Sequence, residues 1–391
     1  MFRAIAISRP CGSAMSFLSR GRLWRIVGVT FSGIAGLGIA FLLLAWIGVY
    51  NVAASRGHWA IVEWLLAFGM RNSVETRAMA IQAPPLDNPS LVQLGAAHFH
   101  SGCAFCHAAP GVPHSPIATH MLPVPPELSK AADEWKDKEL FWIVKHGIKY
   151  TGMPSWAALE RSDEVWAVVA FLKRLPSLDA TAYRELALGG LQIAPQGGAA
   201  LAAFGSNADA IGACARCHGD EGRAPASRLV PILHGQSIEF LVSALQAYAS
   251  GKRQSGIMQP VATDLTPAAM RAIAEFYAGL PLPRREAAQL DAASVASGRT
   301  LAIEGIASNG VPPCMACHGA DALPGYPRLA GQHAEYMAGQ LRLWKRGLSV
   351  GTDGSAIMAP IARRLTDRQI DESAAYFATL GPGKPGDGRR P

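Results

Sequence analysis

The chain has 391 residues and a formal net charge of +7, yet only 17% of its residues are charged and half are hydrophobic. At about 100–200 residues per domain, this length predicts two to four domains. The hydrophobic content indicates a membrane segment, and Gly and Pro are too few for a low-complexity chain. A wholly disordered or fibrous protein is therefore excluded.

An uncharged stretch over residues 26–50 predicts a transmembrane anchor. At about 1.5 Å per residue it is roughly 37 Å long, enough to cross a hydrocarbon core of about 30 Å. No acidic residue precedes Glu63, and residues 1–25 carry five arginines, Arg3, Arg9, Arg20, Arg22 and Arg25. The positive-inside rule places this basic N-terminus in the cytoplasm. We expect a single-pass protein of a bacterial inner membrane whose folded domains lie in the periplasm.

The alternative to an uncleaved anchor is a secretory signal peptide, because residues 52–54 resemble a small-residue cleavage site. The apolar stretch is longer than the h-region of about 7–15 residues that such a signal usually has. The arginines account for five of the seven excess positive charges, so the basic balance reflects membrane topology. No basic patch remains that would predict a nucleic-acid partner.

Residues 51–84 connect the anchor to the first predicted domain. Trp59, Trp64, Leu65 and Phe68 suit an amphipathic helix at the membrane interface. A packing role is the simpler interpretation of these side chains, and a quinone site is the alternative.

The sequence pattern Cys-x-x-Cys-His occurs three times, as "CAFCH", "CARCH" and "CMACH", and uses six of the seven cysteines. A redox dithiol would need a strand–helix–strand context, and a zinc site would need a second cysteine pair nearby. The pattern is typical of covalent haem c, whose two vinyl groups add to the thiols while the histidine binds the iron. We therefore predict three haem c groups. Their thioether cysteines are Cys103, Cys106, Cys214, Cys217, Cys314 and Cys317, and their proximal iron ligands are His107, His218 and His318.

A methionine at a matching place in each unit is the predicted sixth iron ligand. Met153, Met258 and Met358 follow the three motif histidines by 46, 40 and 40 residues, and each has a proline one or two residues later. The competing ligands are histidines of the same units, His120 and His146 in the first, His234 in the second and His333 in the third. Because His and Met together close the iron, we expect an electron carrier rather than an enzyme, with no catalytic residue and no small-molecule substrate.

Each unit ends in a predicted helix with a start signal, after Ser162, after Thr266 with Pro267, and after Thr366 with Gln369. No convincing strand pattern is present, so the fold class is all-α. The second and third units also repeat over residues 229–253 and 325–349 at an offset of 96. The predicted organisation is a cytoplasmic segment 1–25, an anchor 26–50, a connecting segment 51–84, domains 85–178, 199–280 and 291–381, linkers 179–198 and 281–290, and a disordered tail 382–391.

Residues 199–381 resemble the tandem diheme cytochromes of the cytochrome c-four family. The shared features are "CARCHGDEG", "CMACHGAD" and a Pro-x-Leu-x-Gly-Gln pattern in each half. Residues 85–178 resemble a separate class I cytochrome c through "TGMPSW" and "DEVWAVVAFLKRLP". The resemblance implies three tandem class I domains, in which an N-terminal helix crosses a C-terminal helix beside the haem. It also implies that the carbonyls of Pro231 and Pro327 hold the rings of the motif histidines. The corresponding group in the first domain is not assigned.

The leading functional hypothesis is a membrane-anchored triheme cytochrome that transfers electrons in a respiratory chain, towards a terminal oxidase. Its partners would be redox proteins such as quinol:cytochrome c reductase, a dehydrogenase or a haem–copper oxidase. The alternative is the triheme subunit of a membrane-bound alcohol or aldehyde dehydrogenase. A haem peroxidase is a third class and would require an open iron position. The formal charge of each domain is close to zero, so no strong electrostatic docking face is predicted.

Overall fold

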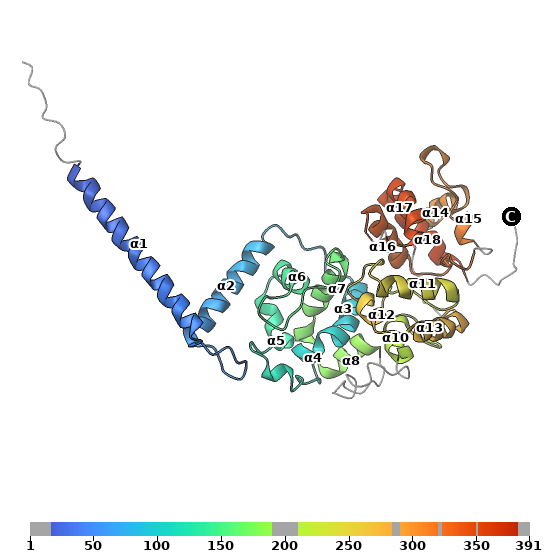
Figure 1. Ribbon diagram of the computed structural model, residues 1–391. Coiled ribbons are helices and arrows are strands. Elements are labelled where there is room, and N and C mark those ends of the chain that lie inside the picture. Colours follow the sequence, from blue (N-terminus) through green and yellow to red (C-terminus); the bar gives the residue numbers. More distant parts are fainter. Residues whose placement is uncertain (1–16, 190–209, 284–289, 320–322, 349–350, 382–391) are drawn as a thin grey trace, which may run out of the picture. The chain divides into compact units, whose positions relative to one another are not determined.

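The structure is a computed structural model that describes residues 17–189, 210–283, 290–319, 323–348 and 351–381 (Figure 1). Cys11, part of both predicted linkers, the start of the second domain and the predicted disordered tail lie outside the described residues. Within the described ranges every regular element is a helix, and β-pairing is limited to isolated bridges, which confirms the all-α fold class. The chain divides into two compact units, Met1–His58 and Trp59–Pro391.

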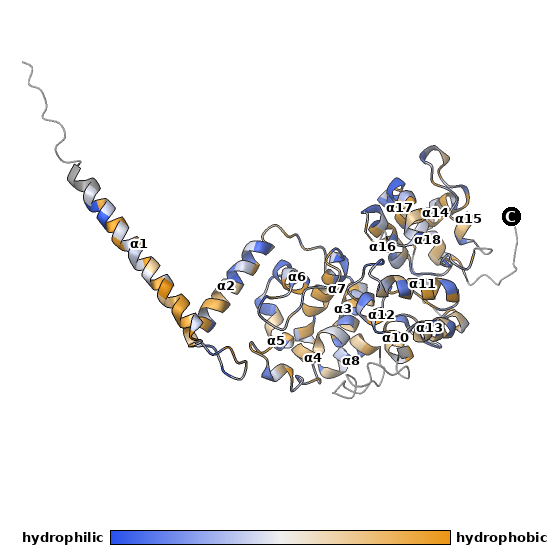
Figure 2. Cartoon of the chain, in the orientation of Figure 1, coloured by the Kyte–Doolittle hydropathy of each residue, from blue (hydrophilic) through white to orange (hydrophobic). Residues whose placement is uncertain are grey.

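The first unit contains one long helix, α1 (Phe17–Trp46). Its segment Gly21–Trp46 has a mean hydropathy of 2.2 and no buried side chain, which is the length and composition of a membrane span or of a signal sequence (Figure 2). The helix ends four residues before the predicted limit of the anchor at Tyr50. The break coincides with Gly48, whose φ of 68° is incompatible with a continuing right-handed helix.

The second unit begins with α2 and the first haem domain. Its helices are α2 (Ala60–Ala78), α3 (Pro89–Gly102), α4 (Ala104–His107), α5 (Leu128–Ala131), α6 (Asp137–His146), α7 (Ser162–Leu172) and α8 (Ala180–Leu188). Short 3₁₀ turns lie at Ala118–His120, Ala132–Glu134 and Leu175–Ser177. The Asn88 side chain caps α3 by accepting a hydrogen bond from the Ser90 N–H at 2.9 Å. Phe99 of α3 and Phe171 of α7 are fully buried where the two helices cross.

The predicted crossing of N-terminal and C-terminal helices is present in the first and third domains, and in both a glycine permits it. A Cβ atom on Gly95 of α3 would lie 2.0 Å from the Ala167 carbonyl oxygen of α7. In the third domain, a Cβ on Gly298 would lie 1.9 Å from the Glu372 carbonyl oxygen. The backbones therefore approach so closely that a methyl group cannot fit between them.

The described parts of the other two domains are also helical. The second contains α10 (Ala210–His218), α11 (Ile238–Ala249), α12 (Met258–Thr263) and α13 (Pro267–Gly279). The third contains α14 (Ala292–Glu304), a 3₁₀ turn at Ala307–Asn309, α15 (Met315–His318), α16 (Ala334–Lys345), α17 (Asp353–Arg364) and α18 (Asp367–Thr379).

Two of the three predicted helix caps are confirmed. The Thr266 hydroxyl accepts from the Ala269 N–H before α13, and Thr366 and Gln369 form a capping box before α18. Ser162 is not a cap, because α7 already begins at this residue and its hydroxyl instead accepts a hydrogen bond from the Lys145 ammonium at 3.0 Å.

Helix α8 was not expected, since its residues fall in the predicted linker 179–198. Asp179 caps it by accepting from two backbone N–H groups, and Tyr183 is completely buried against Phe99 and Phe171. The Tyr183 hydroxyl lies 2.9 Å from Nδ1 of His100. The core of the first domain therefore extends to Leu188, beyond the predicted boundary at residue 178.

Helix α2 has two different halves. Its C-terminal half packs on the first domain through buried Val74 and Ala78, and the Arg71 guanidinium lies 4.6 Å from the ring centre of Trp135. Trp59, directly before the helix, and the N-terminal half of the helix expose apolar side chains, which within the helix include Ile61, Trp64, Leu65, Leu66 and Phe68. The change along the helix is visible in Figure 2. The four side chains that the sequence singled out, Trp59, Trp64, Leu65 and Phe68, are thus exposed and do not support the packing interpretation. Their role at the membrane interface stays a prediction.

The glutamines of the repeated Gly-Gln pairs form hydrogen bonds between the second and third domains. The Gln236 side chain donates to the Arg328 carbonyl at 2.8 Å and accepts from the Arg328 N–H at 2.9 Å. The Gln332 side chain makes the same pair of bonds with the backbone of Ile232, at 3.0 and 2.9 Å. Both glutamines are buried, so the repeated residues join the two domains reciprocally.

Candidate haem sites

Each Cys-x-x-Cys-His motif folds as a single helical turn. The His107 N–H donates to the Cys103 carbonyl at 2.9 Å, and the His318 N–H donates to the Cys314 carbonyl at 3.0 Å. The second motif forms the end of α10, which stops at His218. Residues three and four apart share one face of a helix, so the turn brings both thiols and the imidazole to the same side.

The motif thiols have the character of attachment points rather than of redox dithiols. All six are free of disulfide bonds. Burial raises the pKa of the Cys103 thiol to about 12 and that of Cys214 to about 11. A redox-active pair needs a thiol whose pKa is lowered, so the electrostatics here oppose that chemistry.

Each of the three motif histidines makes the same kind of hydrogen bond, from its Nδ1 to the carbonyl of a proline. The distances are 2.9 Å from His107 to Pro126, 3.0 Å from His218 to Pro231 and 2.9 Å from His318 to Pro327. A carbonyl can only accept, so Nδ1 carries the proton and Nε2 keeps its lone pair for a metal. Burial lowers the pKa of all three imidazoles, which favours the same neutral form.

The proline contacts at Pro231 and Pro327 confirm what the family resemblance implied. Pro126 is the missing equivalent in the first domain. The segment around it contains three prolines, at 123, 125 and 126, and no local signal distinguishes them. The choice depends on how the chain returns to His107 from nineteen residues away.

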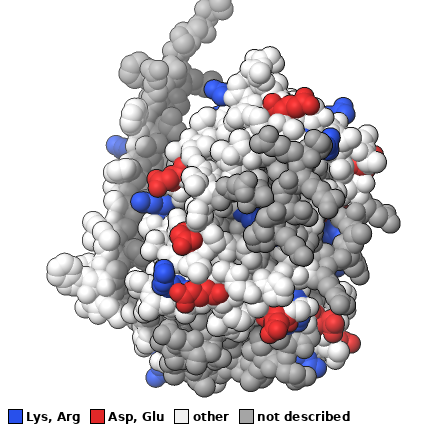
Figure 3. Space-filling model, turned by 90° about the vertical axis from the view of Figure 1, so that its right-hand side faces the viewer, with Lys and Arg blue, Asp and Glu red and all other residues white. Residues whose placement is uncertain are grey.

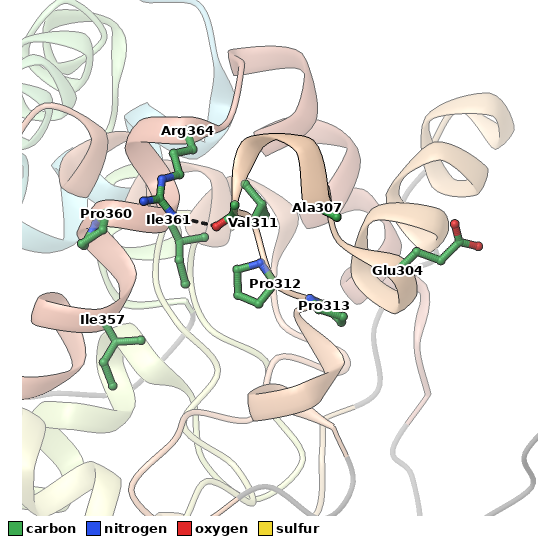
Figure 4. A pocket seen from close by; sticks show the side chains of 10 residues that line it. Glu304, Ala307, Val311, Pro312, Pro313, Ile357, Pro360, Ile361 and Arg364 are labelled. Atoms are coloured by element: carbon green, nitrogen blue, oxygen red, sulfur yellow. Dashed lines mark hydrogen bonds between the residues drawn. The ribbon is translucent and has the colours of Figure 1, made fainter.

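The third domain has an apolar hollow of about 600 Å³ beside its motif (Figure 4). Pro312 and Pro313, directly before Cys314, line one side, and Ile357, directly before Met358, lines the other. Figure 4 shows the two sets of side chains on opposite walls. The lining is mostly apolar but also includes Glu304 and Arg364, and it borders on Cys314 and Met358 only through their neighbours in sequence. The hollow together with the two thiols and the oriented imidazole beside it fits a haem c.

The predicted methionine ligands are all half-buried, and each has a defined backbone setting. The Met153 N–H donates to the Thr151 hydroxyl at 3.1 Å, and the Met258 N–H donates to the Ser255 hydroxyl at 3.0 Å. Met358 lies within α17. Their coordination of iron stays a prediction.

A further methionine lies at the first site. A Cβ atom on Gly152 would come within 1.9 Å of the terminal methyl carbon of Met121, so this thioether side chain lies against the residue before Met153. Met121 was not predicted from the sequence as a residue near the first haem site, because neither of the other two units has a methionine at a matching position.

The competing histidines have other partners or other settings. His120 and His146 are exposed. His234 is buried, and its Nε2 donates to the Asp220 carbonyl at 2.9 Å, so this nitrogen already has a partner within the protein. Nδ1 of His333 lies 3.1 Å from the Val230 carbonyl oxygen, in the contact between the second and third domains.

Comparison with known proteins gives matches in two parts of the chain. Residues 90–172 match the family of cytochrome c oxidase, cbb3-type, subunit III, and residues 298–381 match the cytochrome c family. The thiosulfate dehydrogenase electron acceptor of Stutzerimonas stutzeri is 34% identical over 195 residues, which are 49% of this chain and 86% of that protein. Cytochrome c4 of Pseudomonas aeruginosa is 31% identical over 171 residues, 43% of this chain and 83% of that protein.

The chain is a multihaem c-type cytochrome with cytochrome c4-like domains. A solved structure of cytochrome c4 from Acidithiobacillus ferrooxidans is 31% identical and covers 43% of this cytochrome and 98% of the solved chain, with a TM-score of 0.39. A haem c at each of its three motifs would supply a one-electron couple. The chain's own part is to attach the group through two thiols and to present a neutral, oriented imidazole.

Proposed function

We propose that this cytochrome is a membrane-anchored triheme electron carrier that faces the bacterial periplasm and passes electrons towards a haem–copper oxidase. The observation that carries the proposal is the proline carbonyl on Nδ1 of each motif histidine, which prepares three equivalent imidazoles for iron. The methionine at a matching place in each unit would close the sixth position. The apolar helix α1 supports the anchor, and the similarity of residues 90–172 to an oxidase subunit supports the direction.

The proposed relay runs within one compact unit. Buried contacts connect the first domain to the second, including the bond from the Ser227 hydroxyl to the Ser90 carbonyl at 2.7 Å. The reciprocal Gln236 and Gln332 bonds connect the second domain to the third. Rigid contacts of this kind would hold neighbouring haems at constant separations, which a relay of single electrons requires.

The closed iron sites can be tested with carbon monoxide, which binds reduced haem only at an open position. We expect no binding by the full-length reduced protein and binding at one haem in each of the variants Met153→Ala, Met258→Ala and Met358→Ala. Carbon monoxide binding to the unaltered protein would contradict the carrier function and favour haem chemistry at an open iron.

The direction of transfer needs a second test, in native membranes. Deletion of the gene should slow quinol-dependent oxygen uptake, and the wild-type gene should restore it. A variant with both Cys314 and Cys317 replaced by Ala, which lacks the third haem, is the matched control and should not restore the full rate. Unchanged oxygen uptake after deletion would refute the proposed path to an oxidase.

The similarity to thiosulfate dehydrogenase electron acceptors suggests a candidate electron donor for this cytochrome. This cytochrome would then receive electrons from a dehydrogenase that oxidises a sulfur compound. Mixing the oxidised protein with thiosulfate dehydrogenase and thiosulfate should reduce its haems rapidly, whereas an alcohol or aldehyde dehydrogenase should not. Rapid reduction by the latter pair alone would favour the triheme dehydrogenase subunit instead.

The surface charge predicts how such a partner would dock. On the face drawn in Figure 3, acidic and basic side chains are interspersed without a field of one sign. The near-zero formal charge of each domain agrees with this view. Reduction rates should therefore depend only weakly on ionic strength.

A further inference from the structure

We propose that the first haem domain holds the methionine loop of the second haem in place, with Glu164 as the positioning residue for Met258. The inference rests on the proposed assignment of Met258 as an iron ligand. It concerns a different question, namely which part of the chain stabilises that loop.

The Glu164 carboxylate lies on α7 of the first domain and is 4% exposed. Its Oε1 accepts a hydrogen bond from the Ser255 hydroxyl at 2.6 Å, and its Oε2 accepts one from the Gly256 N–H at 2.6 Å. Both donors belong to the second domain, three and two residues before Met258. Within the first domain, Arg161 pairs with Oε1 at 2.9 Å and the Trp156 indole N–H donates to Oε2 at 3.2 Å.

The Ser255 hydroxyl transmits this contact to the methionine backbone. Its oxygen accepts from the Met258 N–H at 3.0 Å and from the Ile257 N–H at 3.2 Å. A hydroxyl has one proton to donate, and here it points at Glu164. The Ser255 hydroxyl thus accepts from the backbone N–H groups at the start of α12, and its own orientation is set by the neighbouring domain.

Two further contacts connect the first domain to the same loop, residues 254–256. The Arg161 guanidinium donates to the Gln254 carbonyl at 2.8 Å. A Cβ atom on Gly256 would lie 2.0 Å from the Trp156 indole nitrogen, so the loop passes directly over that ring. Three consecutive residues, 254–256, therefore each meet the first domain.

The third domain offers an internal comparison, because Ser355 stands three residues before Met358 as Ser255 does before Met258. The Ser355 hydroxyl donates to the Thr352 carbonyl at 2.6 Å and accepts from the Thr352 N–H at 2.9 Å. Thr352 also caps α17, which already begins at Asp353. These hydrogen bonds of the third methionine segment stay inside its own domain, although a Cβ atom on Gly351 would lie 2.8 Å from the Lys252 carbonyl oxygen of the second domain.

The second domain lacks this local solution. Lys252 occupies the position of Thr352 and is exposed, and α12 does not begin until Met258. In the third domain the Ser355 hydroxyl and the Ala356 N–H both donate to the Thr352 carbonyl. Their counterparts here, the Ser255 hydroxyl and the Gly256 N–H, donate to Glu164. The difference gives the second haem a ligand loop whose order depends on contact with the first haem domain.

The carboxylate is specifically required, because both of its oxygens only accept. In Glu164→Gln the amide nitrogen would face a donor from Ser255, Arg161, Gly256 or Trp156, and at least one buried donor would lose its partner. Asp163→Asn is the matched control. Asp163 also pairs with Arg161, at 2.8 Å, yet its side chain is more exposed and the bonds described for it stay within the first domain.

The test uses redox titration of the full-length holoprotein, followed through the long-wavelength band that methionine-ligated ferric haem shows. Met258→Ala first identifies which midpoint potential and which part of the band belong to the second haem. We expect Glu164→Gln and Ser255→Ala to lower that same potential and weaken that part of the band, with three covalent haems retained. Asp163→Asn should leave both unchanged.

Two further measurements separate positioning from general loosening. Hydrogen exchange at the Ile257 and Met258 amides should accelerate in Glu164→Gln while the Met358 amide stays protected. In the double variant Glu164→Gln/Ser255→Ala the two effects should be non-additive, since both break one chain of bonds.

The outcomes are distinct. If Met258→Ala shifts no potential, the ligand assignment fails. If Met258→Ala shifts one potential and Glu164→Gln leaves it in place, the positioning role is refuted. An equal shift of all three potentials, reproduced by Asp163→Asn, would also refute it, because it would report loss of general order in the protein.

Discussion

Gly95→Ala tests whether the helix crossing of the first domain is limited by backbone contact. The added Cβ would lie 2.0 Å from the Ala167 oxygen, 2.6 Å from the Ala167 carbonyl carbon and 2.9 Å from the Phe171 Cβ. Ordinary contact begins near 3.4 Å, so α3 and α7 would have to separate by roughly 1.4 Å. None of these atoms is the end of a flexible side chain, so the clash cannot be relieved by a rotamer change.

The expected cost can be weighed against the gain from helix propensity. Overpacking of a core costs about 1–3 kcal/mol, and Gly to Ala within a helix gains up to about 1 kcal/mol. We expect a net loss of about 2 kcal/mol in the free energy of unfolding of the first domain. Gly339→Ala in α16 is the control, because no atom lies within 4 Å of its added Cβ. It should be neutral or stabilising.

The assay is hydrogen exchange of the α3 and α7 amides, since a chain of several domains need not unfold in one step. Protection in these two helices should fall in Gly95→Ala and remain in α14 and α18. If Gly95→Ala is as stable as Gly339→Ala, the crossing is not limited by backbone contact and the reasoning is wrong.

Three other predictions concern the haem sites and pH. Replacing both Cys314 and Cys317 with Ala should reduce the covalent haem content by one group of the three, measured by mass; an unchanged count would refute the attachment site. Met358→Ala should lower one midpoint potential and leave all haems attached, and three unchanged potentials would exclude Met358 as a ligand. Burial, with a smaller effect of the nearby Arg216 charge, lowers the pKa of His98 from 6.5 to about 4. Between these two pH values the unfolded protein therefore binds more protons at His98 than the folded protein does. The contribution of His98 to stability should be complete above about pH 6.5 and disappear towards pH 4. The denaturant midpoint of unfolding should therefore change less over this pH range in His98→Gln than in the unaltered protein.

The predictions that the structure confirmed rest on residues close together in the chain. Thr366 and Gln369 lie within one helical turn, so their capping box depends on little beyond its own segment. The motif turn is equally local, because Cys314 and His318 are only four positions apart and are joined by a backbone hydrogen bond. Ser162 shows the limit of such reasoning, since a lysine from α6 competes for its hydroxyl and the helix starts one residue earlier than its cap pattern predicts.

The features that were missed depend on distant segments. The repeat showed that Gln236 and Gln332 correspond, but their bonds to the opposite domain required the two domains to be packed. Gly95 and Gly298 look like ordinary helix residues until another backbone lies across them. Helix α8 has a local cap at Asp179, but the burial of Tyr183 that joins it to the first domain depends on Phe99 and Phe171 from other helices.

The sequence by itself determined the three attachment motifs and the histidines that follow them, because each depends on spacing within about one helical turn. It also determined the all-α class, because no segment has a convincing strand pattern. Tertiary structure alone decided that Pro126 serves His107 and that Glu164 of one domain reaches the loop before Met258 of the next. Those choices are made by segments that meet only after folding. The physical reason is that buried donors and acceptors must be paired, and the partner is whichever group the packing of the helices brings within reach.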